Sequence, residues 1–421
     1  MIDVDAQDLL TRLFRAAVEA ADPEAALRPV LPDPPKGRTV VVGAGKGAAQ
    51  MAAAFETLWE GEIEGVVVTR YGYGAACERI RVMEASHPVP DAAGLAAAKA
   101  LFEAVEGLSE DDLVVALICG GGSALLPAPP EGLTFQDEAA LNRALLASGA
   151  PIGAMNAIRK QVSRIKGGRL AAAAHPARVV SLIVSDVPGD APAEVASGPT
   201  VPDARDLATA RDLIKAHRIS LPEQVSAFLE AGPAPAPHPD DPEFARDEVH
   251  VIASASISLE AAARVAEAEG VPAVILSDAI EGEARDVGRV HAAIATEVAT
   301  KARPFAPPVL ILSGGETTVT LSGDGGRGGR NTEFLLAFAG GIEGQNIVAM
   351  SADTDGIDGS EDNAGAFADG TTWARLRAAG QDPMALLSAH DAWGAFDAVG
   401  DLFVPGPTGT NVNDFRAILV R

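Results

Sequence analysis

Strand-like apolar runs alternate with helix-like segments along most of this chain, and this alternation constrains the fold more than any other feature. Examples are Thr39 to Val42, Gly65 to Thr69, Leu113 to Ile118 and Val179 to Val184. Continuous apolar runs of this length are typical of strands that are buried on both faces. Strands that alternate with helices predict an α/β fold with a mostly parallel sheet covered by helices on both faces. In such sheets ligands bind beyond the carboxyl ends of the strands.

The chain is long enough, at 421 residues, for two or three domains. The segment Ala231 to Pro242, AGPAPAPHPDDP, is the clearest break in composition, and its prolines predict a stiff linker. The strand and helix alternation resumes after it. We therefore expect one domain over residues 1–235 and a second over residues 236–421. The return of the final strand to the first domain is an alternative.

The charge balance and the cysteines argue against several classes of function. The 33 basic and 58 acidic residues give a net charge of −25, which disfavours nucleic acid and anionic membranes as partners. The two cysteines, Cys77 and Cys119, imply no disulfide framework and indicate a reducing compartment. Residues 1–21 predict an amphipathic helix without the basic start and apolar core of a signal peptide. We expect a cytoplasmic protein that acts on small molecules.

Two glycine-rich segments each follow a predicted strand and precede a predicted helix. In Gly43 to Gly47 a lysine, Lys46, stands among glycines at a helix start, where backbone N–H groups and an ammonium suit a phosphate. The spacing fits a dinucleotide fingerprint poorly, and Thr69 and Arg70 stand where a ribose-binding carboxylate would be needed. Gly120 to Ser123 is the second segment. The alternative for each is a tight turn of structural use only.

The stretch from Leu310 to Phe334 concentrates ligand-binding chemistry in one place. Its apolar strand ends on Ser313-Gly314-Gly315, and Glu316 follows at once. Thr317 to Leu321 predicts a short strand, and Gly323 to Gly329 predicts a flexible loop before Arg330. A carboxylate, two arginines and free backbone N–H groups suit a phosphorylated ligand with a metal ion. A glycine-rich hairpin with solvated charges is the alternative.

Polar residues elsewhere add a basic patch and two carboxylate groups. Residues 151–174 predict one long helix on which Asn156, Arg159 and Lys160 lie within about a turn of each other. This cluster suits an anionic substrate, and a solvated helix face is the alternative. Carboxylates that follow buried strands are a usual way to hold Mg²⁺ with a polyphosphate, and turn caps are the alternative for each of them. They are Asp186, Asp190, Asp353, Asp355 and Asp358.

Ten short segments, in order along essentially the whole chain, resemble the type II glycerate 2-kinase family, whose C-terminal region is called the MOFRL domain. Some members of this family are named hydroxypyruvate reductase. Any one of the segments is weak evidence, whereas ten in order are specific. They are VGAGKG at 42–47, SHPVPD at 86–91, CGGGSA at 119–124, residues 156–168, SDVPG at 185–189, SGPTVPD at 197–203, SGGET at 313–317, GGRNTE at 328–333, SADTDGIDG at 351–359 and TNVND at 410–414.

The resemblance implies transfer of the ATP γ-phosphoryl group to the 2-hydroxyl of D-glycerate. It implies a Rossmann-like, doubly wound N-terminal domain, a C-terminal α/β MOFRL domain and an active site in the cleft between them. Lys46 and Arg330 are then expected to stabilise the transferring phosphoryl, with Asp186 as a further catalytic carboxylate. Arg159 would pair with the glycerate carboxylate, and Asp190, Glu316 and Asp353 would hold Mg²⁺. Other expected substrate- and ATP-binding residues are Gly45, Gly120, Gly121, Gly122, Ser123, Asn156, Gly314, Gly315, Asn331, Thr354 and Asn413.

Two other functions stay open at this point. An NAD(P)-dependent hydroxypyruvate reductase is favoured by Gly43-Ala44-Gly45 and disfavoured by the missing ribose carboxylate. A non-catalytic protein that binds a sugar acid or a sugar phosphate is the second rival. A homodimer is a further expectation, on which the residues themselves give no information.

Overall fold

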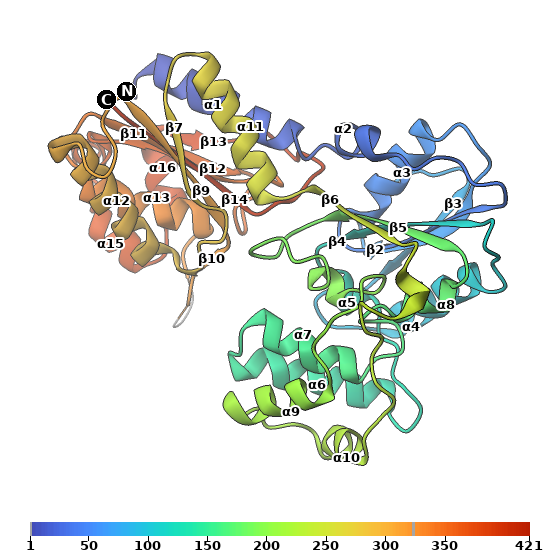
Figure 1. Ribbon diagram of the computed structural model, residues 1–421. Coiled ribbons are helices and arrows are strands. Elements are labelled where there is room, and N and C mark those ends of the chain that lie inside the picture. Colours follow the sequence, from blue (N-terminus) through green and yellow to red (C-terminus); the bar gives the residue numbers. More distant parts are fainter. Residues whose placement is uncertain (1, 322–324) are drawn as a thin grey trace. The chain divides into compact units, whose positions relative to one another are not determined.

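The computed structural model describes residues 2–321 and 325–421, and its elements group into two units (Figure 1). Pro23–Ile252 form the parallel-sheet unit. The residues up to Asp22, together with Ala253–Arg421, form the mixed-sheet unit. Among the helices described, none combines the length and the apolarity that a membrane crossing needs. Gly323, which the sequence placed at the start of a loop, lies outside the described residues.

The parallel-sheet unit confirms the predicted α/β architecture. Its six-stranded sheet has the order β3-β2-β1-β4-β5-β6, and the neighbours from β3 to β5 pair in parallel. The order runs outward from β1 in both directions, so β1 and β4 flank a topological switch point, where ligands bind in such sheets. The strands are β1 Thr39–Ala44, β2 Glu64–Arg70, β3 Ile80–Ala85, β4 Leu113–Cys119, β5 Arg178–Val184 and β6 Glu248–Ala253.

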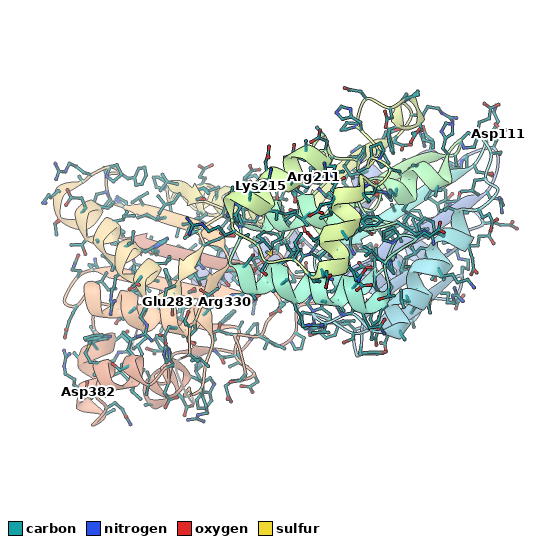
Figure 2. All side chains as sticks on the ribbon, turned by 90° about the horizontal axis from the view of Figure 1, so that it is seen from below. Asp111, Arg211, Lys215, Glu283, Arg330 and Asp382 are labelled. Carbon is teal, nitrogen blue, oxygen red and sulfur yellow. The ribbon has the colours of Figure 1, made fainter. Side chains whose placement is uncertain are left out.

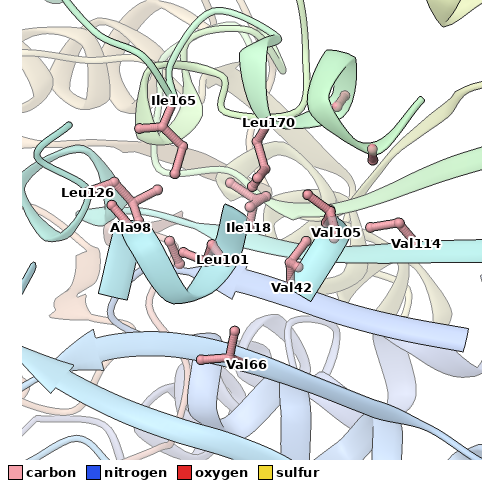
Figure 3. Packing of buried hydrophobic residues seen from close by; sticks show 14 of the residues in the cluster. Val42, Val66, Ala98, Leu101, Val105, Val114, Ile118, Leu126, Ile165 and Leu170 are labelled. Atoms are coloured by element: carbon pink, nitrogen blue, oxygen red, sulfur yellow. The ribbon is translucent and has the colours of Figure 1, made fainter. Parts of the chain in front are cut away.

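Helices cover both faces of this sheet, because the strands are apolar on both sides. Val42, Val66 and Val114 lie in one buried cluster with Leu101 of α4, whereas α3 covers the opposite face (Figures 1 and 3). A separate helical cluster, formed by α6, α7, α9 and α10, has its own apolar core around Leu145. The helices are α2 Pro23–Leu27, α3 Ala48–Leu58, α4 Ala92–Val105, α5 Gly122–Leu125, α6 Phe135–Ser148, α7 Ile152–Gln161, α8 Arg169–Ala174, α9 Leu207–Ala216 and α10 Glu223–Ala231, with short 3₁₀ turns η1 Arg28–Val30, η2 Val195–Ser197 and η3 Pro242–Phe244.

The mixed-sheet unit differs, since most of its strand pairs are antiparallel. The sheet order is β13-β12-β11-β14-β9-β7, and β7 and β9 form a parallel pair. No helix lies between β11 and β12 in the chain, and a parallel pair needs such a crossover. The strands are β7 Ala273–Ser277, β9 Val309–Gly315, β11 Ile347–Asp353, β12 Gly365–Asp369, β13 Leu402–Phe403 and β14 Asp414–Val420, beside a small sheet of β8 Gly282–Glu283 and β10 Thr317–Thr318.

Two helical layers also cover this second sheet. Leu310 and Phe415 pack with α1 and α11 on one face, whereas Ile311 and Ile418 pack with α12 and α13 on the other (Figure 1). Exposed charges such as Lys215 and Asp382 mark the outer surfaces of the two units (Figure 2). The helices are α1 Val4–Glu19, α11 Ala255–Ala268, α12 Ala284–Lys301, α13 Arg330–Gly341, α14 Thr372–Ala378, α15 Pro383–Ser388 and α16 Ala392–Val399.

The structure changes several of the expected boundaries. The division between the units falls after Ile252, so the proline-rich segment from Ala231 lies inside the parallel-sheet unit. The N-terminal helix α1 belongs to the mixed-sheet unit, and the final strand β14 lies inside that unit's own sheet. The long helix expected over residues 151–174 is two helices, because Gly167 and Gly168 adopt φ of 64° and 81° between them. The strand expected over residues 317–321 is limited to β10.

Candidate active site

The loops that follow β1 and β4 meet at the switch point of the parallel sheet. The backbone N–H of Lys46 donates to the carbonyl of Gly120 at 2.8 Å, and that of Gly47 contacts Sγ of Cys119 at 3.1 Å. From β2, the Thr69 hydroxyl donates to the carbonyl of Lys46 at 3.0 Å. These bonds fix the backbone around Lys46 and bring together the two glycine-rich segments.

Glycine is needed at positions 120, 121 and 122 because neighbouring side chains occupy the space that a Cβ atom would fill. A Cβ on Gly120 would clash with the carboxylate of Asp186. Gly121 has a φ of +78°, and a Cβ there would lie 3.0 Å from Cγ of Lys46 and 3.1 Å from Nε2 of His87. A Cβ on Gly122 would lie 2.7 Å from that of Ala196. Lys46, Asp186 and His87 therefore surround one stretch of bare backbone.

His87 is a residue of this site that the sequence did not identify. Burial, followed by the charges of Lys46 and Arg70, lowers the pKa of His87 to about 4. Its imidazole is therefore neutral near pH 7 and can offer one donor and one acceptor beside the glycines. A histidine that directly precedes a proline, as His87 precedes Pro88, is typical of a turn and so does not stand out in the sequence. Its motif, SHPVPD, was the signal that could have found it.

Arg159 of α7 is a cation whose hydrogen-bond partners are amides, and the charge of Glu138 acts on it without forming an ion pair in the described residues. Its Nε donates to Oδ1 of Asn142 at 2.9 Å and its Nη1 to Oδ1 of Asn156 at 3.0 Å. Within residues 2–321 and 325–421 it forms no ion pair. Burial lowers its pKa, which means that the charged form is held at a cost. A partly buried guanidinium whose hydrogen-bond partners are amides has the chemistry to bind an anion.

Lys160, the next residue, has a different role from the one that the sequence allowed. Its side chain is 1% exposed and its Nζ pairs with Glu194 at 3.1 Å and with Asp203 at 2.5 Å. Burial lowers its pKa to about 8. Arg205 pairs with the same two carboxylates. This buried group fixes the loop of η2, so the helix carries neither a continuous basic patch nor a solvated face.

Asp190, expected to bind a metal, lies in the loop after β5. Its backbone is left-handed, with a φ of 51°, and its N–H donates to the carbonyl of Val187 at 3.1 Å. In the described residues no three His, Cys, Asp or Glu side chains come together as a metal cluster. The expected metal ligands Glu316 and Asp353 belong to the mixed-sheet unit.

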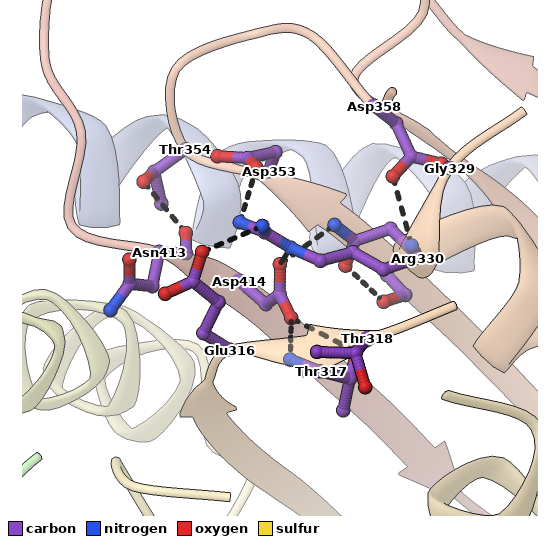
Figure 4. A network of polar contacts seen from close by, with 12 residues as sticks. Glu316, Thr317, Thr318, Gly329, Arg330, Asp353, Thr354, Asp358, Asn413 and Asp414 are labelled. Carbon is purple, nitrogen blue, oxygen red and sulfur yellow. Dashed lines mark hydrogen bonds and ion pairs between the residues drawn. The ribbon is translucent and has the colours of Figure 1, made fainter. Parts of the chain in front are cut away.

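Arg330 is the centre of a carboxylate cluster in the mixed-sheet unit (Figure 4). It begins α13, and its three nitrogens reach three separate acids. Nε donates to Asp414 at 2.6 Å, Nη1 to Glu316 at 2.9 Å and Nη2 to Asp353 at 2.7 Å. The side chains of Asp414 and Asp353 are 0% and 7% exposed, whereas Glu316 is 54% exposed. The structure thus brings together three of the predicted site residues, Arg330, Glu316 and Asp353.

The pKa shifts in this cluster reflect its excess of negative charge. Burial favours neutral Arg330, but Asp414, Asp353 and Glu316 outweigh it and raise its pKa. Burial, assisted by the charges of Asp355 and Asp414, raises the pKa of Asp353 despite Arg330. For Asp414, burial is outweighed by Arg416 and Arg330, which lower its pKa. Arg330 is therefore a permanent cation, and Asp353 is the acid most ready to gain a proton.

The other predicted binding residues of this unit are buried and bonded within it. Asn331 is 0% exposed; its Nδ2 donates to Asp414 at 2.9 Å and its Oδ1 accepts from Ser351 at 2.6 Å. The Thr354 hydroxyl donates to the carbonyl of Asn413 at 2.7 Å. The carbonyl of Gly314 accepts from Arg416 at 3.2 Å, and Gly315 is buried beside it in β9. Gly45, in the parallel-sheet unit, donates its N–H to Val68 at 3.1 Å.

Asp414 is the main residue of this cluster that the sequence missed. One oxygen accepts from Arg330 and Asn331, and the other contacts Arg416 and the N–H of Thr317. It opens the final strand within the segment TNVND, which offered the only signal for it. Because Asp414 binds both arginines, it orders the whole cluster.

Comparison with known proteins finds similar sequences and a similar fold along this chain. Residues 9–230 match a family model described as a domain of unknown function, DUF4147, and residues 309–414 match the MOFRL family. A protein of Agrobacterium vitis named "Putative hydroxypyruvate reductase" is 54% identical over 99% of this chain and 95% of its own length. The "Glycerate 2-kinase" of Pyrococcus horikoshii is 40% identical over 100% of this chain and 98% of its own. The crystal structure of a Thermotoga maritima glycerate kinase has a TM-score of 0.89 and 36% identity, and it covers 100% of both chains.

Proposed function

Because this chain belongs to the MOFRL family of glycerate 2-kinases, we propose that it transfers the γ-phosphoryl group of ATP to the 2-hydroxyl of D-glycerate. The observation that carries the proposal is the group at the switch point, where Lys46 and Asp186 flank three glycines. Phosphoryl transfer depends mainly on positioning and on neutralisation of negative charge. An ammonium and a carboxylate beside bare backbone supply a phosphate contact and a proton acceptor together.

Arg159 is the residue that we propose for the carboxylate of glycerate. Its guanidinium is held by two amide oxygens, which orient it without cancelling its charge. A carboxylate can accept two parallel hydrogen bonds from such a group. Binding of the substrate would then supply the anion that the partly buried arginine lacks. Lys160 cannot take this role, since Glu194 and Asp203 already neutralise it.

Lys46 and Asp186 are the proposed catalytic pair. The ammonium of Lys46 is expected to contact the transferring phosphoryl group, where negative charge must be neutralised. The carboxylate of Asp186 is expected to receive the proton of the 2-hydroxyl as the new P–O bond forms and the bond to ADP breaks. The neutral imidazole of His87 adds a donor and an acceptor beside them.

Arg330 is the proposed second cation for the phosphoryl group, and its carboxylate partners are the proposed metal ligands. Glu316 and Asp353 offer the hard oxygen donors that Mg²⁺ prefers, and Mg²⁺ commonly uses one or two carboxylates together with substrate phosphates. Two carboxylates held by one guanidinium fit this requirement. When bound, Mg²⁺ neutralises phosphate charge. Asp190, in the loop after β5, stays a separate prediction for a metal ligand.

A hydroxypyruvate reductase remains the rival, because the relative from Agrobacterium vitis carries that name. The end of β2 offers Thr69 and Arg70, and no carboxylate for a ribose. We propose a cytoplasmic enzyme, with ATP and D-glycerate as its small-molecule partners. The sequence, with two cysteines, supports the reducing compartment that this proposal assumes. A homodimer stays a prediction.

Release of ADP in the presence of ATP and Mg²⁺ tests the proposal. We expect ADP to form in step with the D-glycerate added, and we expect no oxidation of NADH or NADPH when hydroxypyruvate replaces glycerate. Nicotinamide oxidation without ADP formation would reject the kinase in favour of the reductase. Stabilisation by D-glycerate without any turnover would instead indicate a binding protein.

A further inference from the structure

A continuous chain of side-chain hydrogen bonds leads from the buried acid Glu194 to Ser123 in the glycine-rich loop. Nδ2 of Asn156 donates to Oε2 of Glu194 at 2.9 Å and to its carbonyl at 3.1 Å. Oδ1 of Asn156 lies 3.0 Å from the hydroxyl of Ser197. That hydroxyl lies 2.9 Å from the hydroxyl of Ser123. Ser123 is half-buried and ends this series of hydrogen bonds, whose other side chains are buried.

The amide orientation of Asn156 follows from its neighbours. A reversed amide would place its oxygen against the carboxylate and the carbonyl of Glu194, both of which can only accept. It would also place its NH₂ group against Nη1 of Arg159, which can only donate. The side chains of Asn156 and Glu194 are 2% and 8% exposed, so water does not relieve such a mismatch. Oδ1 therefore faces Ser197.

This orientation of the amide fixes which group donates and which accepts in each hydrogen bond between Asn156 and Ser123. Ser197 must donate its one hydroxyl proton to Oδ1 of Asn156, because that oxygen can only accept. Ser123 must then donate its own proton to Ser197. The remaining lone pairs of Ser123 can only accept a hydrogen bond. Its side chain consequently suits a donor, such as a substrate hydroxyl, and does not suit a phosphate oxygen.

The backbone around Ser197 is held in an uncommon conformation that places its hydroxyl in this chain. Ala196, Ser197 and Gly198 have φ of 53°, 61° and 59°, which is rare for residues with a Cβ. The carbonyl of Ser197 accepts from Gly167 at 3.0 Å, and that of Gly198 accepts from Gly168 at 2.7 Å. Such conformations persist where the surrounding structure determines them, and they cluster at functional sites.

We propose that Ser123 accepts a hydrogen bond from the 3-hydroxyl of D-glycerate and so selects a substrate with a second hydroxyl. This assignment rests on the proposed kinase function and deepens it. The reacting 2-hydroxyl must lose its proton, whereas the amide of Asn156 gives the chain no means to carry a proton to Glu194. Ser123 therefore suits the hydroxyl that keeps its proton. Asn156 also bonds Arg159, so one amide orients both the carboxylate contact and the hydroxyl contact.

The test compares D-glycerate with D-lactate, which has the same configuration and lacks the 3-hydroxyl. For the wild type we expect kcat/KM to be at least about 10-fold higher with D-glycerate, since a site that bonds a hydroxyl rejects the analogue without it. Ser123→Ala is expected to lower kcat/KM for D-glycerate by about 10- to 100-fold and to leave the value for D-lactate within about 3-fold. The ratio of the two values is the readout.

Two further variants separate this role from a general effect on folding. Ser226→Ala makes the same change on α10 of the same unit, where the hydroxyl contacts Glu230 at 3.3 Å, and should leave the ratio unchanged. Ser197→Ala tests the positioning role, because it removes the acceptor that fixes the Ser123 proton. We expect it to lower the ratio by about 3- to 10-fold, less than Ser123→Ala does.

Several results would overturn the assignment. They are a wild type that does not distinguish the two acids, a Ser123→Ala variant that lowers both values equally, and a Ser197→Ala variant with an unchanged ratio. A Ser123→Ala variant whose KM for ATP rises at a constant ratio would place Ser123 at the phosphates instead. A wild type that phosphorylates neither acid would overturn the proposed function, and this assignment with it. If Ser123→Ala fails to fold, the ratio of Ser197→Ala decides, because that variant removes the acceptor of the Ser123 proton and leaves Ser123 in place.

Discussion

Two arginines of this protein are held in opposite ways. Arg159, in the parallel-sheet unit, contacts two amide oxygens, and burial lowers its pKa. Arg330, in the mixed-sheet unit, contacts three carboxylates, which raise its pKa although burial opposes them. The first forms no ion pair in the described residues and is stabilised only partly by the charge of Glu138, whereas the second is surrounded by more negative charge than it carries.

This difference suggests different partners for the two residues. A guanidinium that forms no ion pair favours a monoanion such as a carboxylate, because binding completes its charge balance. A guanidinium in an acidic cluster already stabilises the fold through its ion pairs. The cluster as a whole still carries excess negative charge, so additional positive charge, as Mg²⁺ would supply, stabilises it most. Loss of Arg330 should therefore damage folding and activity, whereas loss of Arg159 should damage substrate binding alone.

The largest effect is expected for Arg330→Met. Removing one partner of a buried ion group leaves uncompensated charge, so we expect the free energy of unfolding to fall by about 3–5 kcal/mol and phosphorylation to be lost. Urea unfolding followed by circular dichroism measures the first effect. Asp353→Asn added to Arg330→Met should recover part of the stability, since Asp353 is an acid whose pKa is raised. Loss of less than about 1 kcal/mol in the single variant would show that the cluster is not a structural unit.

Lys46→Ala should separate catalysis from stability. We expect kcat to fall by about 10³-fold, because a single contact to developing charge is typically worth 10²- to 10³-fold. The free energy of unfolding should change by less than about 1 kcal/mol, since Lys46 forms no ion pair within the described residues. Lys99→Ala, which removes an exposed lysine paired with Glu103 at 3.3 Å, is the control and should leave kcat unchanged. Near wild-type turnover of Lys46→Ala would remove it from the site.

Arg159→Met should act on one substrate only. We expect KM for D-glycerate to rise by about 10- to 100-fold, the typical value of hydrogen bonds to a charged group, and KM for ATP to stay constant. Stability should change by less than about 1 kcal/mol, because no ion pair is lost. Steady-state kinetics with each substrate varied in turn measures this. An increase in KM for ATP alone would reverse the assignment of Arg159.

The smallest effect concerns Asp247, a half-buried acid that accepts from the N–H of Val179 at 2.9 Å. Burial raises its pKa from 3.8 to about 6, despite Val179, His175 and Arg246. The folded state therefore binds this proton more tightly than the unfolded state. The contribution of Asp247 to the free energy of unfolding is fully present below pH 3.8 and is lost as the pH rises to about 6.

Asp247→Asn removes that pH-dependent loss. After a discount for its partial exposure, we expect the variant to exceed the wild type by about 1 kcal/mol at pH 8. The advantage should diminish as the pH falls from 6 towards 4. Urea midpoints across this range measure it, and an advantage that does not depend on pH would contradict the cause.

The parallel sheet and its switch point could be predicted from the sequence, whereas the second sheet could not. Strands buried on both faces read as apolar runs, and β1, β4 and β5 each end in a recognisable loop. The strand Gly365–Asp369, GAFAD, has no β-branched residue, so its strand character and the antiparallel pairing it introduces left no pattern. The position of α1 beside α11 depends on packing between distant segments.

The sequence could nominate charged residues for a site, but it could not say how they are paired. Lys46, Arg159, Asp186 and Arg330 were identified because each stands near a strand end or on a basic helix. That Lys160 is neutralised depends on Glu194 and Asp203, which are 34 and 43 residues away. The left-handed backbone at Ser197 has only Gly198 as a local signal. Pairing and buried hydrogen-bond direction are tertiary properties, and short motifs do not carry them.

Identification of the product by NMR tests the central claim most directly. Purified protein, ATP, Mg²⁺ and D-glycerate should yield 2-phosphoglycerate in equal amount to the ADP released, because Arg159 and Ser123 are proposed to leave the 2-hydroxyl facing Lys46 and Asp186. Formation of 3-phosphoglycerate would keep a kinase but contradict the arrangement of glycerate. The absence of any phosphorylated glycerate would contradict the account as a whole.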